Sequence, residues 1–259
     1  MSDAAPKVFL LPGIGGDEPP LADFRAAMGY RVAFELLDYP DVDRPSAEIR
    51  DFDGIVRHLL KRVSELEPLG IVHLAGYSFG GQAAFALACK LQEEGRSVGL
   101  LAILDSRAPT LRLSKSGQRV TNTDDALSPA MACADLTSRL LIAAGLSEAV
   151  RASIRPAGNL FGVKAGQSLR RLLLQNLRGR SLSGLEFGRF DGPILLFRAK
   201  EQLVRGLAAD LGWSAHCTSV QAIELEGGHN SLFESNHLAA NIDLVWSAIE
   251  GRVRSDQRR

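Results

Sequence analysis

The sequence has few cysteines, few aromatic residues and no excess of charge of either sign. Its three cysteines, Cys89, Cys133 and Cys217, lie far apart, which excludes a disulfide framework and a CxxC metal or redox pair. The 30 Lys and Arg residues balance the 30 Asp and Glu residues, so no overall field attracts nucleic acid. We therefore expect no nucleic-acid partner, no metal and reduced cysteines.

Long apolar runs are lacking as well. After Lys7 only a short apolar run precedes Pro12, too short for a signal-peptide core or a membrane span. We expect a cytoplasmic protein that does not cross a membrane. A chain of 259 residues has the length of one large α/β domain with an insertion. The sequence has no coiled-coil period from which an oligomeric state could be predicted.

Continuous apolar segments alternate with segments of helical period. Five of these apolar segments resemble parallel strands that are covered on both faces, at 7–11, 32–37, 71–76, 98–105 and 193–199. A sixth segment, 220–227, alternates more and favours a strand nearer the sheet edge. Helical periods occur at 47–66, 80–94, 203–211 and 237–249. This order predicts an α/β fold with a mostly parallel, doubly wound sheet.

One stretch interrupts the alternation. Residues 109–187 contain helical pieces but no convincing strand, and such a length exceeds that of a connecting loop. Open α/β sheets bind ligands at the carboxyl ends of their strands. We therefore expect a single domain, 1–259, with 109–187 inserted as a helical lid over that edge. A purely structural appendage is the alternative.

The segment Gly76-Tyr77-Ser78-Phe79-Gly80 fits the pattern G-x-S-x-G. A strand-like run precedes it and an Ala-rich helical run follows it, which is the context of a nucleophile elbow. Glycines are needed there because larger side chains would collide with the neighbouring strand and helix. The elbow predicts Ser78 as a nucleophile; a structural glycine turn is the alternative.

A nucleophilic serine needs a base, and the base needs an acid that orients it. Among the five histidines, His229 follows the last expected strand and a flexible Gly-Gly pair, so it is the candidate base. Two carboxylates also follow expected strands, Asp105 and Glu201. Both keep the chain order of serine, acid and histidine that is typical of the fold, so this order leaves the acid open.

The loop LLPGIGG follows the first expected strand. Pro12 has no N–H to donate, whereas Gly13, Ile14 and Gly15 have one each. These groups are candidates for an oxyanion hole, together with the N–H of Phe79 directly after the serine. The loop has neither the G-x-G-x-x-G nor the P-loop spacing, so a nucleotide cofactor is not expected.

The chain resembles the thioesterase domains that release products from nonribosomal peptide and polyketide synthases. The resemblance rests on GYSFGG at 76–81, AILDSRAP at 102–109, LGWS at 211–214 and GGHNSL at 227–232, and it covers almost the whole chain. It implies an α/β-hydrolase fold and favours Asp105 over Glu201 as the acid. It also implies Ile14 and Phe79 as backbone donors to the oxyanion, and a lid at 109–187.

The resemblance further implies a function. The enzyme would release an acyl, peptidyl or polyketide chain from the phosphopantetheine of an acyl or peptidyl carrier protein, through an acyl-Ser78 intermediate. Hydrolysis or cyclisation would follow, with Ser78, Asp105 and His229 as the triad and no cofactor. Two alternatives stand beside it: a small-molecule carboxylesterase or lactonase, and a catalytically silent relative that binds an acyl carrier.

Overall fold

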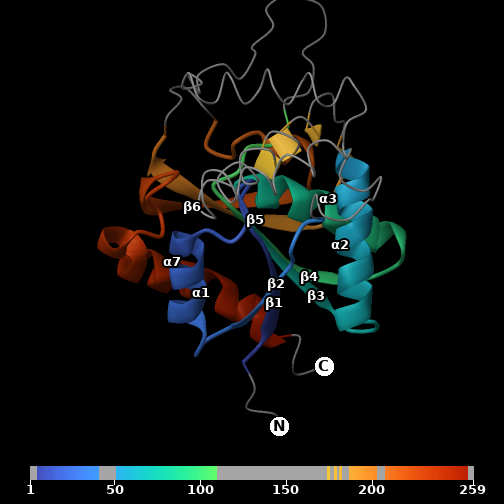
Figure 1. Cartoon of the computed structure of the whole chain (residues 1–259), viewed down its shortest axis with the longest axis horizontal. Helices are drawn as coiled ribbons and strands as arrows, with labels where there is room; N and C mark the ends of the chain where they lie inside the picture. Colours follow the sequence, from blue (N-terminus) through green and yellow to red (C-terminus); the bar gives the residue numbers. More distant parts are fainter. Residues whose placement is uncertain are drawn as a thin grey trace, which may run out of the picture.

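A parallel β-sheet forms the centre of the computed structural model (Figure 1). The structure describes residues 5–40, 51–109, 174–175, 178–179, 181–182, 187–202 and 208–255. Within them, the six-stranded sheet has the order β2-β1-β3-β4-β5-β6, and every neighbouring pair is parallel. The strands are β1 (Lys7–Leu11), β2 (Ala33–Leu36), β3 (Val72–Tyr77), β4 (Val98–Leu104), β5 (Pro193–Glu201) and β6 (Ser219–Gly228).

The six strands coincide with the six predicted segments, and β6 lies at the edge of the sheet as its alternating pattern indicated. The doubly wound α/β prediction is therefore confirmed. The chain places β2 on one side of β1 and β3 on the other side. The switch point of the sheet therefore lies at the carboxyl ends of β1 and β3. Open α/β sheets bind their ligands at this point.

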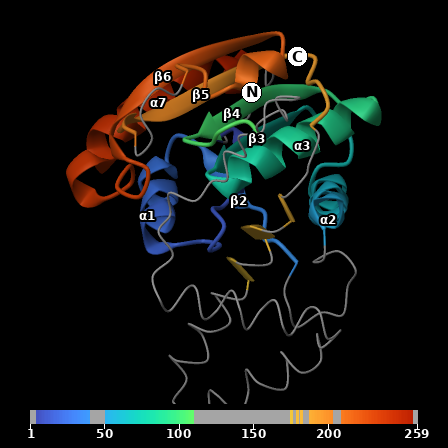
Figure 2. The same ribbon diagram turned by 90° about the horizontal axis from the view of Figure 1, so that it is seen from above.

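Helices cover both faces of the sheet (Figures 1 and 2). One apolar core joins the sheet to α2 (Phe52–Leu66) and α3 (Phe79–Glu93), and a second joins it to α1 (Pro19–Met28) and α7 (Ser235–Ser255). The Asp51 side chain begins α2 by accepting a hydrogen bond from the Gly54 N–H at 2.6 Å. A short 3-10 helix, Trp213–Ala215, precedes β6.

Two predictions about helices were incomplete. The sequence pattern missed α1, because this helix begins with two prolines and has a mixed apolar pattern. The helix expected at 203–211 is wrong at its described end, since 209–211 form a turn and 203–207 lie outside the described residues. Most of the expected lid, 109–187, also lies outside them. Across the described ranges, no helix has the length and apolar character that a membrane span requires.

Candidate active site

Ser78 occupies a strained turn between β3 and α3. Its backbone has φ 54° and ψ −120°, a conformation that non-glycine residues rarely adopt. A Cβ on Gly76 would lie 2.1 Å from the Gly80 carbonyl oxygen, and a Cβ on Gly80 would lie 2.2 Å from that of Leu11. The two glycines therefore permit the turn, as the sequence motif indicated. The N-terminus of α3 follows Ser78 directly, and its first N–H groups have no partner within the helix.

We expect Gly80→Ala to destabilise the fold, because the new methyl group would collide with backbone atoms that cannot move aside. A loss of about 1 to 3 kcal/mol or more in the free energy of unfolding is expected from urea titrations. Gly251→Ala is the matched control, since Gly251 lies in α7 with nothing near its missing Cβ. It should gain about 0.5 to 1 kcal/mol. A Gly80→Ala protein as stable as the wild type would contradict this reading of the elbow.

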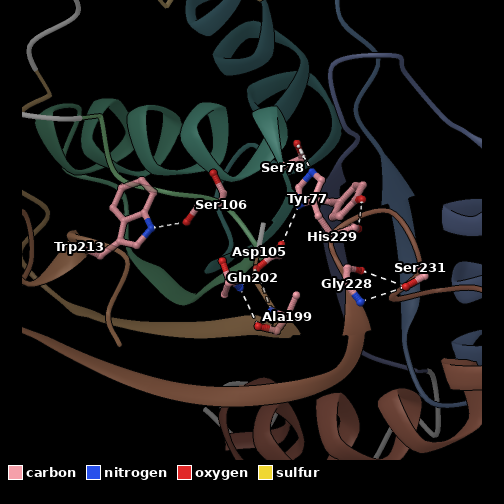
Figure 3. Close-up of polar contacts among 10 residues, drawn as sticks. All are labelled: Tyr77, Ser78, Asp105, Ser106, Ala199, Gln202, Trp213, Gly228, His229 and Ser231. Atoms are coloured by element: carbon pink, nitrogen blue, oxygen red, sulfur yellow. Dashed lines mark hydrogen bonds and ion pairs between the residues drawn. The ribbon is translucent and has the colours of Figure 1, made fainter. Parts of the chain in front are cut away.

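Ser78, His229 and Asp105 lie in one hydrogen-bonded row (Figure 3). The Nε2 atom of His229 lies 3.0 Å from the Ser78 Oγ, and its Nδ1 atom lies 2.7 Å from the Asp105 Oδ2. The three residues follow β3, β6 and β4 and meet at the carboxyl edge of the sheet. These are the three residues predicted from the sequence, and the structure brings their side chains together.

The Asp105 carboxylate is buried and has several hydrogen-bond donors. Its Oδ1 accepts from the Ala199 N–H at 2.8 Å and from the Gln202 side chain at 3.1 Å (Figure 3). Burial acts to raise the pKa of Asp105, but the hydrogen bonds from His229, Ala199 and Gln202 outweigh it, so the pKa is lowered. An ionised carboxylate only accepts, so the His229 Nδ1 donates to Asp105, which leaves Nε2 as the ring atom that faces the Ser78 hydroxyl.

This lowered pKa has a consequence for stability. The ionised Asp105 stabilises the fold above the carboxyl pKa of the unfolded chain, and this contribution is lost as the pH falls through the lowered folded value.

Glu201, the other candidate for the acid, ends β5 and pairs in register with Gly228. The carboxylate that contacts His229 is that of Asp105.

Tyr77 holds the histidine loop from the elbow side. Its hydroxyl donates to the His229 carbonyl oxygen at 2.6 Å, and its ring stacks on the imidazole with the centroids 5.2 Å apart. Burial is the main cause that raises the pKa of Tyr77, so the hydroxyl keeps its proton. Neither Tyr77 nor Gln202 was predicted as a support of the row, since only the fold brings each beside a partner that is far away in the chain.

The loop after β1 is held by its carbonyl groups. The Tyr39 hydroxyl donates to the Pro12 carbonyl at 2.6 Å, and the Gly16 N–H donates to the Gly13 carbonyl at 3.0 Å. In a trans peptide the N–H points away from the carbonyl of the same unit. The N–H of Ile14 therefore points away from Gly16.

Arg178, within the expected lid range, fixes the next peptide of this loop. Its guanidinium donates to the Ile14 carbonyl at 2.8 Å and lies 4.7 Å from the centre of the Tyr39 ring. Burial is the main cause that lowers the pKa of Arg178. No sequence pattern predicted this contact, because the two residues are distant in the chain and nothing near Arg178 resembles a motif.

A cavity of about 270 Å³ opens beside the Ser78 hydroxyl, with room for several substrate atoms beyond a reacting carbonyl. Its described lining consists of loop, helix and triad residues: Gly13, Ile14, Gly15, Gly16, Glu18, Pro20, Leu21, Tyr77, Ser78, Gln175, His229, Asn230 and Phe233. The Phe79 ring is buried against Tyr39 and Phe52 instead. Within the described ranges, no cluster of His, Cys, Asp and Glu has the form of a metal site.

Two of the segments on which the resemblance rests, 102–109 and 211–214, meet next to the row. The Trp213 indole N–H donates to the Ser106 carbonyl at 2.7 Å, directly after Asp105 (Figure 3). A Cβ on Gly81 would lie 2.5 Å from the Ser106 Cβ, so α3 packs closely on the same segment. Trp213 and α3 thus both contact Ser106, the residue that directly follows Asp105.

A parallel α/β sheet with a serine elbow, a histidine after the last strand and a carboxylate at a strand end defines the α/β-hydrolase class. Residues 6–246 match the Thioesterase domain family, and the chain belongs to this family. It is therefore a thioesterase of the serine hydrolase type. The fold, the family and the enzyme class expected from the sequence are confirmed.

Relatives of the chain are found within large synthetases. It is 49% identical over 73 residues to the vanchrobactin synthetase VabF of Vibrio anguillarum, which is 28% of this chain and 3% of that protein. It is 24% identical over 224 residues to the enterobactin synthase component F of Escherichia coli (strain K12), which is 79% of this chain and 16% of that protein. The chain thus spans a small part of these relatives.

Solved thioesterases have the same fold. The NocB thioesterase domain from the nocardicin cluster has a TM-score of 0.63 at 18% identity, covering 95% of each chain. The type II thioesterase BorB from the borrelidin cluster has a TM-score of 0.61 at 23% identity, covering 97% of this chain and 94% of BorB. The RedJ thioesterase of Streptomyces coelicolor has a TM-score of 0.63 at 18% identity, covering 94% of this chain and 86% of RedJ.

Proposed function

We propose that this thioesterase releases an acyl, peptidyl or polyketide chain from the phosphopantetheine of a carrier protein, through an ester on Ser78. The observation that carries the proposal is the row Ser78–His229–Asp105, with its 3.0 and 2.7 Å hydrogen bonds. Such a row supplies a nucleophile, a base and an orienting acid. The family and the synthetase relatives support a thioester as the substrate.

In the first half-reaction, His229 takes the Ser78 proton as the Oγ attacks the thioester carbonyl. Asp105 stabilises the imidazolium that forms. When the tetrahedral intermediate collapses, the carbon–sulfur bond breaks and His229 returns the proton to the phosphopantetheine sulfur. The products are a free thiol and an acyl ester of Ser78.

In the second half-reaction, His229 removes a proton from the nucleophile that attacks the acyl ester. Water yields a free acid, whereas an amine or hydroxyl of the same chain yields a lactam or a lactone. The new tetrahedral intermediate collapses, and Ser78 recovers its proton from His229. The lid expected at 109–187 would decide which nucleophile reaches the ester.

The backbone N–H groups of Ile14 and Phe79 are the proposed donors to the oxyanion. Phe79 begins α3 at its positive end, and Ile14 lines the cavity. The carbonyls of Gly13 and Ile14 are held by hydrogen bonds, which supports a fixed orientation of the peptide that contains the Ile14 N–H. Loss of one such donor typically costs about 100-fold or more in rate.

The partner and the setting follow from the same proposal. We infer an acyl or peptidyl carrier protein as the partner, because the chain belongs to the Thioesterase domain family and matches part of the enterobactin synthase component F of Escherichia coli (strain K12). No nucleic acid, membrane, metal or cofactor has a part in this chemistry, and the cytoplasm is the expected compartment.

Matched pairs of substrates test the proposal. For one acyl group presented as an N-acetylcysteamine thioester and as the isosteric oxygen ester, we expect kcat/KM to be at least about 10-fold higher for the thioester after correction for its uncatalysed rate. Preference for the oxygen ester would favour a carboxylesterase or lactonase. Absence of turnover on every substrate would favour the silent acyl-carrier-binding relative.

A further inference from the structure

The loop that carries His229 turns on two glycines. Gly227 and Gly228 directly precede the histidine, and Gly227 has a φ of 91°, a conformation that other residues rarely adopt. The glycines let the chain turn from β6 toward the triad, but they also give the loop more conformational freedom than other residues would. The His229 ring nevertheless keeps two hydrogen bonds, at 3.0 and 2.7 Å. The loop therefore depends on contacts from outside the triad.

Helix α7 supplies such a contact through Asn241. This side chain is fully buried, at 0% exposure, and it makes three hydrogen bonds. Its Oδ1 accepts from the Glu226 N–H at 2.8 Å, and its Nδ2 donates to the carbonyls of Glu226 and Leu232 at 2.9 and 2.8 Å. Glu226 and Leu232 lie three residues before and three residues after His229. One amide thus joins the two ends of the histidine loop, which we define as 226–232.

The partners of Asn241 determine how its amide is oriented. The backbone N–H can only donate and the two carbonyls can only accept, so the amide oxygen and nitrogen cannot be exchanged. Because β6 is the last strand of the sheet, two of the bonds satisfy the Glu226 N–H and carbonyl as a further strand would. These two bonds alone would stabilise only the strand edge. The third bond, to Leu232, reaches the far side of His229 and closes the loop.

Further contacts hold the loop between its two ends. The Gly228 N–H donates to the Ser231 Oγ at 2.9 Å (Figure 3), and the Ser231 N–H donates to the Gly228 carbonyl at 2.9 Å. Helix α7 also packs on Gly227, since a Cβ there would lie 2.7 Å from the His237 Cδ2. His237 and Asn241 are four residues apart, so they lie on one face of α7. This face of the helix therefore packs against the histidine loop.

We propose that Asn241 is a positioning residue for the catalytic base: by closing the histidine loop, it holds the His229 Nε2 in line with the Ser78 Oγ. Asn241 is outside the described lining of the cavity and bonds to the loop backbone rather than to the triad. The inference rests on the proposed function for the role of His229 as base, and it applies to any acyl chain. A displacement of a reacting group by about 1 Å costs on the order of 100-fold in rate, so a loosened loop should lower kcat.

The test replaces Asn241 by leucine, which has a similar size and no hydrogen-bonding group. Asn241→Leu should lower kcat for the butanoyl N-acetylcysteamine thioester by about 10- to 100-fold. KM should stay within about threefold, because His229 acts in both half-reactions and Asn241 lies outside the described cavity lining. Asn241→Ala is a second variant in case the first does not fold. Its smaller side chain leaves room for a water that bonds to the released groups, so kcat should fall less, by about 10-fold.

A control of equal stability is needed, because the unpaired backbone groups of Glu226 and Leu232 also lower the free energy of unfolding. Ile249 is buried in the same helix, about 12 Å further along its axis. Of Ile249→Val and Ile249→Ala, the control is the variant whose urea midpoint is nearer to that of the Asn241 variant. It should keep kcat and KM within about twofold of the wild type.

Three results of the kinetics would overturn the inference. They are a wild-type kcat in a folded Asn241 variant, a change confined to KM, and an equal loss of kcat in the Ile249 control. The first would show that the three hydrogen bonds only stabilise the fold. The last would show that any weakening of α7 disturbs the triad.

A serine-directed reagent separates this inference from the proposed function. An alkyl fluorophosphonate reacts with a serine that a histidine activates, and it needs no thioester. Its second-order rate constant, measured from the mass of the intact protein, should be about 10-fold or more lower for Asn241→Leu than for the wild type and the Ile249 control. Equal labelling rates would overturn the inference, and a wild type that is not labelled at all would overturn both proposals. A wild type that is labelled but turns over no thioester affects the proposed function alone.

Discussion

Alanine at Ser78, at His229 or at both positions is expected to lower kcat for a thioester by roughly the same factor, on the order of 10⁶. The two residues act as one unit, because the 3.0 Å hydrogen bond between them transfers the proton in both half-reactions. In a protein that already lacks one of the two residues, removal of the other should lower kcat little further. Steady-state kinetics of the three variants against the wild type measure this.

Circular dichroism of each variant is the control for folding. The far-UV spectra should stay those of the wild type, whereas the urea midpoint of His229→Ala should fall somewhat, because the buried Asp105 carboxylate loses its hydrogen bond from Nδ1. Independent effects that multiply in the double variant would contradict a shared proton transfer. So would a His229→Ala variant that retains most of its activity.

Asp105→Asn is expected to lower kcat by about 10⁴-fold, whereas Glu201→Gln should leave it within about twofold. The amide of asparagine offers an N–H where the carboxylate accepted one, so the imidazole loses the tautomer that accepts the serine proton. Asp105 contacts the His229 Nδ1 at 2.7 Å, and Glu201 ends the neighbouring strand. The pair of variants compares two carboxylates at the ends of adjacent strands.

The pH dependence of stability adds a second readout for Asp105. Because the pKa of Asp105 is lowered in the fold, the wild type should lose stability on acidification that Asp105→Asn does not lose. Urea midpoints measured between neutral and acidic pH give this difference. Full activity of Asp105→Asn together with an inactive Glu201→Gln would reverse the assignment of the acid.

The sheet was predictable because its evidence is local. Buried parallel strands are continuous apolar runs, and β1, β3, β4 and β5 show them plainly in the sequence. The elbow was predictable for a similar reason, since Gly76 and Gly80 leave a fixed spacing around Ser78. The helix α1 was missed because its two leading prolines resemble a loop.

The supports of the site were not predictable, because they depend on contacts between distant segments. Gln202 reaches Asp105 across 97 residues, and Arg178 reaches Ile14 across 164. The chain order of serine, acid and histidine left Asp105 and Glu201 open as the acid, and the resemblance to thioesterase domains favoured Asp105. The structure brings the Asp105 carboxylate to His229, at 2.7 Å from Nδ1.

The central claim is that a thioester acylates Ser78. Rapid-quench mass spectrometry of the intact protein after exposure to an acyl-pantetheine thioester tests it most directly, with fragmentation to locate the added mass. We predict one acyl group on the peptide that contains Ser78 in the wild type, and none in Ser78→Ala. Turnover with no acyl adduct at any quench time, or an adduct that persists in Ser78→Ala, would contradict the account.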